Sequence, residues 1–195
     1  MGNPPFLSQL NLATATQRGL AALIKARTDG ATSAYTDTAA VFWIDALTKV
    51  TVGGRVAFLL PQSVLASRDA SAIRHRISQA ASLEHLWVST DHAFADALVA
   101  TCAVVVRNTT QSAGPVERSH SLEFCELPPA ALPGHDNTDE DTWSSLAADA
   151  FGIPTITFAS TESVGALAEA TADFRDEYYG LSGFIVEHAD NMSDK

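Results

Sequence analysis

The chain has 195 residues, 46% of them hydrophobic, which is enough for a domain with a buried core. It shows no signal-peptide pattern and no apolar run of membrane-spanning length, so the sequence excludes an obvious membrane span and predicts a cytoplasmic protein. The net charge of -11 is uneven: residues 1–107 carry 9 Lys+Arg against 7 Asp+Glu, a balance of +2, and residues 108–195 carry 3 against 16, a balance of -13. Contact with a polyanion is therefore expected only in the first half, and the acidic half is either a solvated surface or an acidic partner-binding face.

The chain opens with Asn3-Pro4-Pro5-Phe6, a polar amide followed by two prolines and an aromatic ring. Each proline fixes φ and extends the residue before it, so the carbonyls of Asn3 and Pro4 have little freedom. The side-chain oxygen of Asn3 and the carbonyl oxygen of Pro4 can accept both hydrogens of one NH₂ group, while Phe6 offers a face for stacking. The segment suits a planar base with an exocyclic amino group. A proline-rich N-terminal tail is the alternative interpretation.

Apolar periodicity predicts two helices before the first strand. Residues 7–28 are expected to form a loop and a helix that ends at Asp29-Gly30, and residues 35–50 a second helix that ends at Gly53-Gly54. Residues 56–61 form an unbroken apolar run, which is typical of a strand covered on both faces of a sheet. A helix, a glycine turn and a buried strand in this order predict α/β architecture.

A third helix is expected over residues 67–81, with Ile73 and Ile77 facing inward. Its three arginines are expected to face water: Arg68, Arg74 and Arg76. Two strands should follow, over residues 83–89 and 99–107. The link between them is only about eight residues, too short for a helical crossover, so these strands are predicted to pair antiparallel.

From residue 108 the sequence becomes polar and acidic, which marks a predicted boundary. Residues 121–127 are expected to form a strand, and residues 128–141 a polar loop rich in proline, glycine and acid. Further on, residues 155–158 are expected to form a strand and residues 162–171 a helix.

The N-terminal motif, preceded by Gly2, resembles the Asn/Asp/Ser-Pro-Pro-Tyr/Phe/Trp motif of the N6-adenine DNA methyltransferases of restriction-modification systems. The segment Gly53-Gly54 to Pro61 looks like that family's Gly-Gly-strand-Pro segment. Residues 94–101 resemble a later family motif, whose Phe stacks on the opposite face of a flipped base. The resemblance therefore extends over several segments in the family's order.

By this resemblance, Asn3, Pro4, Pro5 and Phe6 form the catalytic motif, and Phe6 and Phe94 stack on an adenine that has been rotated out of double-stranded DNA. The resemblance also implies S-adenosylmethionine as the methyl donor. The implied fold is a partial Rossmann-like methyltransferase sheet, with the family's fifth strand and its antiparallel terminal pair, followed by an acidic α+β extension.

The resemblance covers residues 1–107, about the second half of the family's catalytic domain. Residues 108–195 would be an acidic extension leading towards a target-recognition region, which residues 173–181 loosely resemble. The family's glycine-rich cofactor loop and its ribose-binding acid follow strands that would precede Met1. Most of the cofactor site is therefore expected outside this sequence. Without those strands Val56–Leu60 becomes an edge strand, which predicts a complementary chain or aggregation, and an isolated chain that is inactive.

Two other functional interpretations remain open. Methyltransferases that act on a protein glutamine or an RNA base share Asn-Pro-Pro-Tyr, although the long acidic extension fits them poorly. A non-catalytic interaction module could instead use the strand edge or the acidic half to bind a partner protein. Salt-sensitive DNA binding would favour the methyltransferase interpretation, and binding to a basic protein the interaction module.

The cysteine and histidine pattern predicts no metal site. The six histidines are scattered without ligand spacing, and Cys102 and Cys125 are distant in sequence. Two such cysteines suggest a reducing compartment and no disulfide framework.

Overall fold

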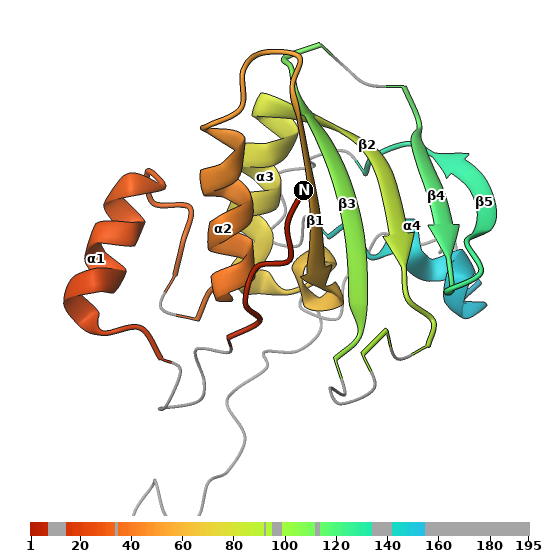
Figure 1. Ribbon diagram of the computed structural model, residues 1–195, viewed down its shortest axis with the longest axis horizontal. Helices are drawn as coiled ribbons and strands as arrows, with labels where there is room; N and C mark the ends of the chain where they lie inside the picture. Colours follow the sequence, from red (N-terminus) through yellow and green to blue (C-terminus); the bar gives the residue numbers. More distant parts are fainter. Residues whose placement is uncertain are drawn as a thin grey trace, which may run out of the picture. The chain divides into compact units, whose positions relative to one another are not determined.

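A computed structural model describes residues 1–7, 15–33, 35–91, 93–94, 99–111, 114–133 and 142–154. All of them belong to one unit, Met1–Thr155, while the second unit, Ile156–Lys195, lies outside the described residues. The described unit is a five-stranded mixed sheet with helices packed on it (Figure 1). This agrees with the predicted α/β class. The strand expected over residues 155–158 and the helix expected over 162–171 fall on residues that are not described.

The sheet has the strand order β1-β3-β2-β4-β5. Strand β3 pairs antiparallel with both β1 and β2, β4 pairs parallel with β2, and β5 pairs antiparallel with β4. The strands are β1 (Arg55–Pro61), β2 (Ala81–Val88), β3 (Thr101–Asn108), β4 (Val116–His120) and β5 (Cys125–Ala130). The antiparallel pairing of the two strands joined by a short link is confirmed.

Helices are found within all three segments where periodicity predicted them. They are α1 (Arg18–Arg27), α2 (Thr38–Leu47) and α3 (Ser71–Ala80), with a short α4 (Ser145–Ala148) and the 3₁₀ turns η1 (Gln62–Leu65), η2 (Arg68–Ala70) and η3 (Asp149–Phe151). Asp37 caps α2 by accepting a hydrogen bond from the Ala39 N–H at 2.7 Å. Within the described ranges, no helix is long and apolar enough to cross a membrane.

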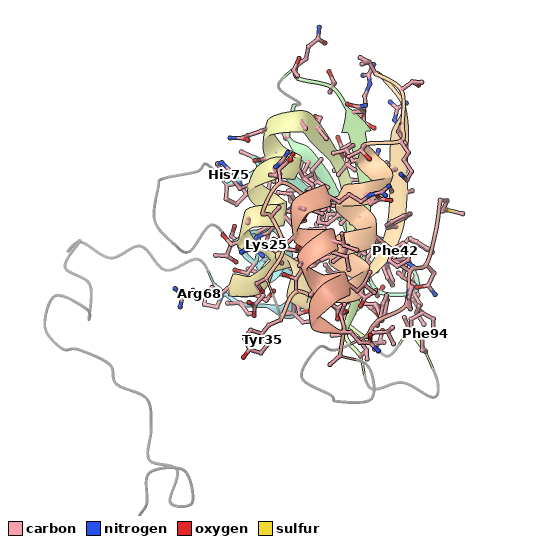
Figure 2. All side chains as sticks on the ribbon, turned by 90° about the vertical axis from the view of Figure 1, so that its left-hand side faces the viewer. Lys25, Tyr35, Phe42, Arg68, His75 and Phe94 are labelled. Carbon is pink, nitrogen blue, oxygen red and sulfur yellow. The ribbon has the colours of Figure 1, made fainter. Side chains whose placement is uncertain are left out.

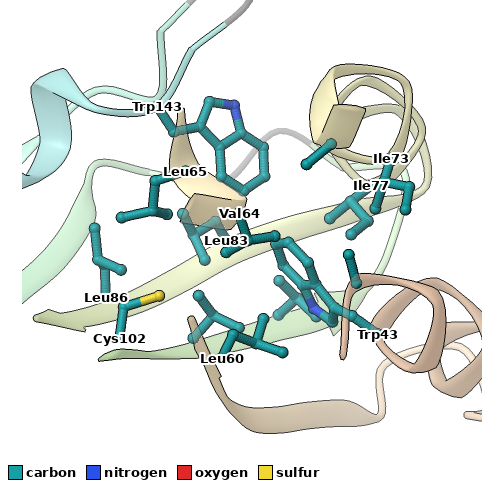
Figure 3. Packing of buried hydrophobic residues seen from close by; sticks show 14 of the residues in the cluster. Trp43, Leu60, Val64, Leu65, Ile73, Ile77, Leu83, Leu86, Cys102 and Trp143 are labelled. Carbon is teal, nitrogen blue, oxygen red and sulfur yellow. The ribbon is translucent and has the colours of Figure 1, made fainter. Parts of the chain in front are cut away.

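The core lies between one face of the sheet and helices α2 and α3 (Figure 3). Trp43 of α2 and Trp143 meet edge to face, with ring centroids 5.9 Å apart, and both rings are buried. The backbone N–H of Trp143 donates to the Leu65 carbonyl at 2.7 Å, which ties the segment before α4 to η1. The core therefore includes residues from the acidic half of the sequence.

The prediction that Arg74 faces water is wrong. Arg74 is only 1% exposed, and its Nη1 donates to the carbonyls of Val64 and Ser67, both at 2.9 Å. These carbonyls belong to the irregular stretch around η1 and η2, where the Ser67 carbonyl also accepts from the Ala70 N–H at 3.2 Å. A buried guanidinium with several donors satisfies both at once. Ile73 and Ile77 face inward as predicted.

The strand predicted over residues 121–127 is wrong at its start. Residues 121–124 form the turn between β4 and β5, with positive φ at Ser121 (60°) and Phe124 (54°). Strand β5 then includes Pro128 and Pro129, which were assigned to a loop. Because β5 is the last strand of the described sheet, its outer side needs no N–H donors, and prolines are tolerated there.

The two cysteines are expected to react very differently. Cys102 is fully buried, and burial raises the pKa of its thiol to about 12, whereas Cys125 is exposed. A thiol reagent at about pH 8 should therefore modify Cys125 in the native protein and Cys102 only after unfolding, because the thiolate is the reactive form. Rapid labelling of Cys102 in the native state would contradict this packing.

The raised pKa of Cys102 also predicts how stability depends on pH. In the unfolded chain the pKa of this thiol is about 8.5. Its contribution to stability is therefore complete below that pH and is lost as the pH rises towards about 12. The alkaline loss of stability, measured by urea unfolding, should be smaller in a Cys102→Ala variant.

Candidate functional site

The N-terminal segment lies beside β1 and pairs with it in parallel (Figure 1). The Gly2 N–H donates to the Ala57 carbonyl at 2.9 Å, and the Leu59 N–H donates to the Gly2 carbonyl at 3.1 Å. A Cβ on Gly2 would lie 2.9 Å from Cε1 of Phe58, so a glycine lets the two backbones approach this closely. The Asn3-Pro4-Pro5-Phe6 motif therefore begins on a backbone held by β1.

Phe6 and Phe94 are in contact, although they come from opposite ends of the sequence that the resemblance covers. Their ring centroids are 6.3 Å apart and the ring planes meet at 76°, an edge-to-face arrangement. Both rings are half-buried. The structure thus brings the two predicted stacking residues together.

The same geometry shows what a bound base would require. A planar base between two rings needs about 3.5 Å on each side, hence parallel rings roughly 7 Å apart. The observed rings touch each other edge to face, so at least one of them must turn before a base can enter between them. In the present arrangement there is no room for a base between the two rings.

The remaining residues of the motif differ in exposure. Pro4 is buried, while Asn3 and Pro5 are exposed. The Asn3 amide makes no hydrogen bond to any residue that the structure describes, so its oxygen is free to accept one. Asn3 lies three residues before Phe6, on the segment that Gly2 pairs with β1, and Phe6 in turn contacts the Phe94 ring.

Strand β1 is an edge strand, as predicted for Val56–Leu60. It pairs with β3 on one side, and among the described residues its other side meets only Gly2. Since the Gly2 bridge is parallel, a longer segment continuing along this side would extend a parallel pair with β1. The candidate motif, which follows Gly2, therefore begins at the unpaired side of β1.

A groove of about 470 Å³ lies between α1 and α2, beginning at Leu7, just after the motif. The groove is mainly apolar, and Phe42, which is 48% exposed, lines it (Figure 2). The Asp45 carboxylate in its wall is already paired with Arg27 at 2.9 Å and Lys49 at 3.4 Å. The sequence did not predict this groove. The apolar periodicity of α1 and of α2 indicates one apolar face on each helix, but it does not give the distance between the two helices.

Replacing Gly2 by valine should detach the N-terminal segment from β1. The new side chain would collide with the Phe58 ring, a clash that typically costs about 1–3 kcal/mol. The Leu59 amide proton, which donates to Gly2, should then exchange with solvent much faster in an NMR hydrogen-exchange experiment. Gly114→Val is the control, since a Cβ there meets nothing within 4 Å. Unchanged protection of Leu59 in Gly2→Val would contradict the pairing.

No family model matches the chain, and no curated protein matches it in sequence. Similar solved structures include a modification subunit of a putative type I restriction enzyme from Vibrio vulnificus YJ016, with 13% identity and a TM-score of 0.49 over 77% of this chain and 29% of that one. A second is the type IIL restriction-modification enzyme MmeI in complex with DNA, with 16% identity and a TM-score of 0.48 over 67% of this chain and 18% of that one. A third is the type IIG restriction endonuclease BpuSI, with 15% identity and a TM-score of 0.45 over 56% of this chain and 14% of that one.

The chain spans less than a third of the length of each of these proteins. Every one of these TM-scores lies below 0.5 and every identity below 25%. The functional assignment of the chain therefore depends on its own residues and contacts.

Proposed function

We propose that this chain is part of a site-specific DNA methyltransferase that transfers a methyl group from S-adenosylmethionine to N6 of adenine. The observation that supports it most is the contact between Phe6 and Phe94, at 6.3 Å, beside an Asn-Pro-Pro motif anchored on β1. In this proposal the two rings separate and stack on opposite faces of a base that has left the duplex.

The Asn3 and Pro4 oxygens would act on the amino group of that base. The N6 lone pair of adenine is delocalised into the ring, which makes the nitrogen a poor nucleophile. When the Asn3 side-chain oxygen and the Pro4 carbonyl oxygen accept the two N6 hydrogens, the lone pair becomes more localised on the nitrogen. S-adenosylmethionine would supply the methyl group: its methyl–sulfur bond would break as the nitrogen bonds to the methyl carbon, S-adenosylhomocysteine would leave, and one N6 proton would pass to solvent. No side chain in this step has to titrate.

The described residues do not fit S-adenosylmethionine on their own. In the described part of the chain no glycine-rich loop follows a strand, and the Asp45 carboxylate in the groove near Leu7 is neutralised by two cations. A ribose-binding acid and a glycine-rich cofactor loop would normally lie at the ends of further parallel strands. We therefore assign cofactor binding to strands that pair with the open side of β1.

The test is binding by the isolated chain. Fluorescence anisotropy should show that a single-stranded oligonucleotide of deoxyadenosine binds about tenfold more tightly than one of deoxythymidine, which has no amino group, and that added salt weakens both. Calorimetry should show no binding of S-adenosylmethionine. Equal affinity for the two oligonucleotides would contradict the base site, and clear methylation of unmethylated DNA by the isolated chain would contradict its assignment as one part of the enzyme. Binding only to a basic protein would favour an interaction module instead.

A further inference from the structure

One side chain links the end of β1 to both ends of the connection that carries Phe94. Gln62 follows the last residue of β1, and its Nε2 donates to the Ser89 carbonyl at 2.8 Å and to the Thr101 carbonyl at 3.0 Å. Its backbone N–H also donates to the Ala100 carbonyl at 2.8 Å. The Gln62 amide thus donates to the residue that follows β2, Ser89, and to the first residue of β3, Thr101, which are the two ends of the connection that contains Phe94.

The anchored ends are themselves firmly held. Ser89 is 3% exposed and Thr101 is fully buried, and the Ser89 N–H donates to the Thr101 carbonyl at 2.9 Å. The Ser89 hydroxyl also donates to the Asp91 carbonyl, further along towards Phe94. The spacing between the two ends of the connection is therefore set by a compact cluster whose centre is the Gln62 amide.

Strand β1 and the residue that follows it are thus bonded to both segments that carry the aromatic rings of the candidate site. The segment with Phe6 is bonded to β1 through Gly2, and the two ends of the connection with Phe94 are bonded to the residue after β1, Gln62. We propose that Gln62 is a positioning residue, which sets Phe94 opposite Phe6 so that the two rings can enclose an adenine. This inference rests on the proposed function for its substrate, although the placement of the rings can be tested without it.

A glutamine is suited to this position because it is neutral and has two donors on a long arm. A glutamate would set a negative charge against two carbonyl oxygens. An asparagine is one methylene shorter and cannot reach both carbonyls. Methionine has nearly the same length and shape but donates no hydrogen bond. Gln62→Met therefore removes the bonds to Ser89 and Thr101 with little change in side-chain volume.

The experiment measures the ring contact directly. In the full chain with ring-labelled phenylalanine, nuclear Overhauser effects between Phe6 and Phe94 should be present in the wild type and lost in Gln62→Met. They should be weakened in Gln62→Asn, which gives a second result if the methionine variant folds poorly. Gln79→Met, which alters an exposed glutamine of α3 bonded to His75, should leave the ring contact unchanged.

The same variants are then tested with a single-stranded oligonucleotide of deoxyadenosine. Gln62→Met should bind it about tenfold more weakly than the wild type and Gln79→Met should not, because a misplaced ring loses its stacking contact. Persistence of the Phe6 to Phe94 contact in both Gln62 variants would overturn the inference. If the contact is lost in Gln62→Met while the wild type shows no preference for adenine, the positioning role stands and the proposed function fails.

Discussion

Replacing Arg74 by methionine is expected to lower the free energy of unfolding by about 3–5 kcal/mol. Arg74 is 1% exposed, and it donates to the carbonyls of Val64 and Ser67. Methionine can fill part of the space but removes this donor from both carbonyls, and an unsatisfied buried acceptor costs about 1–3 kcal/mol. The Ser67 carbonyl keeps its bond from the Ala70 N–H, so the Val64 carbonyl is the more affected of the two. Loss of these bonds should also loosen the turn that joins β1 to α3, so the effect should be among the largest of any single change in the chain.

Urea unfolding followed by circular dichroism measures this loss. Arg68→Met is the matched control, because Arg68 lies on the same short segment and is exposed, so its replacement should change stability by less than about 0.5 kcal/mol. A variant at Arg74 that unfolds at the same urea concentration as the control would show that its two hydrogen bonds do not stabilise the fold.

Replacing Phe94 by alanine is expected to weaken binding of an adenine oligonucleotide by at least about tenfold, because stacking of one base on an aromatic ring contributes about 1–3 kcal/mol. Phe6→Ala should have a similar effect, since each ring is proposed to cover one face of the base. Both rings are only half-buried, so the fold should survive either change.

Phe124→Ala is the control for these variants. Phe124 is 69% exposed and packs on another aromatic ring, that of Trp87, with centroids 6.1 Å apart, so it is a comparable exposed ring outside the proposed site. Its removal should leave oligonucleotide affinity unchanged. If Phe94→Ala binds like the wild type, or if Phe124→Ala loses as much affinity as Phe94→Ala, the Phe6 and Phe94 pair is not the base site.

Much of the sheet and the helices could be predicted, because their signals are local. The spacing of Ile73 and Ile77 in α3 reports burial directly. The apolar run over β1 correctly marks a strand, but Ala57, Phe58 and Leu59 are only partly buried, so this strand is not covered on both faces as predicted. The antiparallel pairing of β2 and β3 follows from the length of the link between them. In these cases the local pattern of apolar residues or the length of a link was enough to predict the element.

The errors arose where burial depends on distant partners. A charged residue such as Arg74 is normally assigned to the surface, and its bonds to the carbonyls of Val64 and Ser67 become visible only in the fold. Pro128 and Pro129 suggest a loop until it is known that β5 is the last strand of the sheet. In both cases the deciding information was a tertiary neighbour, which periodicity cannot report.

The candidate site also contains residues that the sequence predicted and one residue that it did not. Its motif, Asn3 to Phe6, is contiguous, so the sequence alone indicated the chemistry, and the resemblance indicated Phe94 as a partner. Gln62 gave no signal, because one polar residue after a strand is unremarkable until its amide is seen bridging the carbonyls of Ser89 and Thr101. Hydrogen bonds between segments that are distant in sequence can be assigned only from the fold.

The central claim is that the Asn3 and Pro4 oxygens hold the amino group of an adenine placed between two rings. The most direct measurement compares the affinity of the chain for a single strand carrying one adenine with its affinity for the same strand carrying purine, which stacks like adenine but lacks the amino group. The wild type should bind the adenine strand about tenfold more tightly, as two hydrogen bonds would allow, and Asn3→Ala should lose most of that difference. Equal affinity of the wild type for the two strands would contradict the claim.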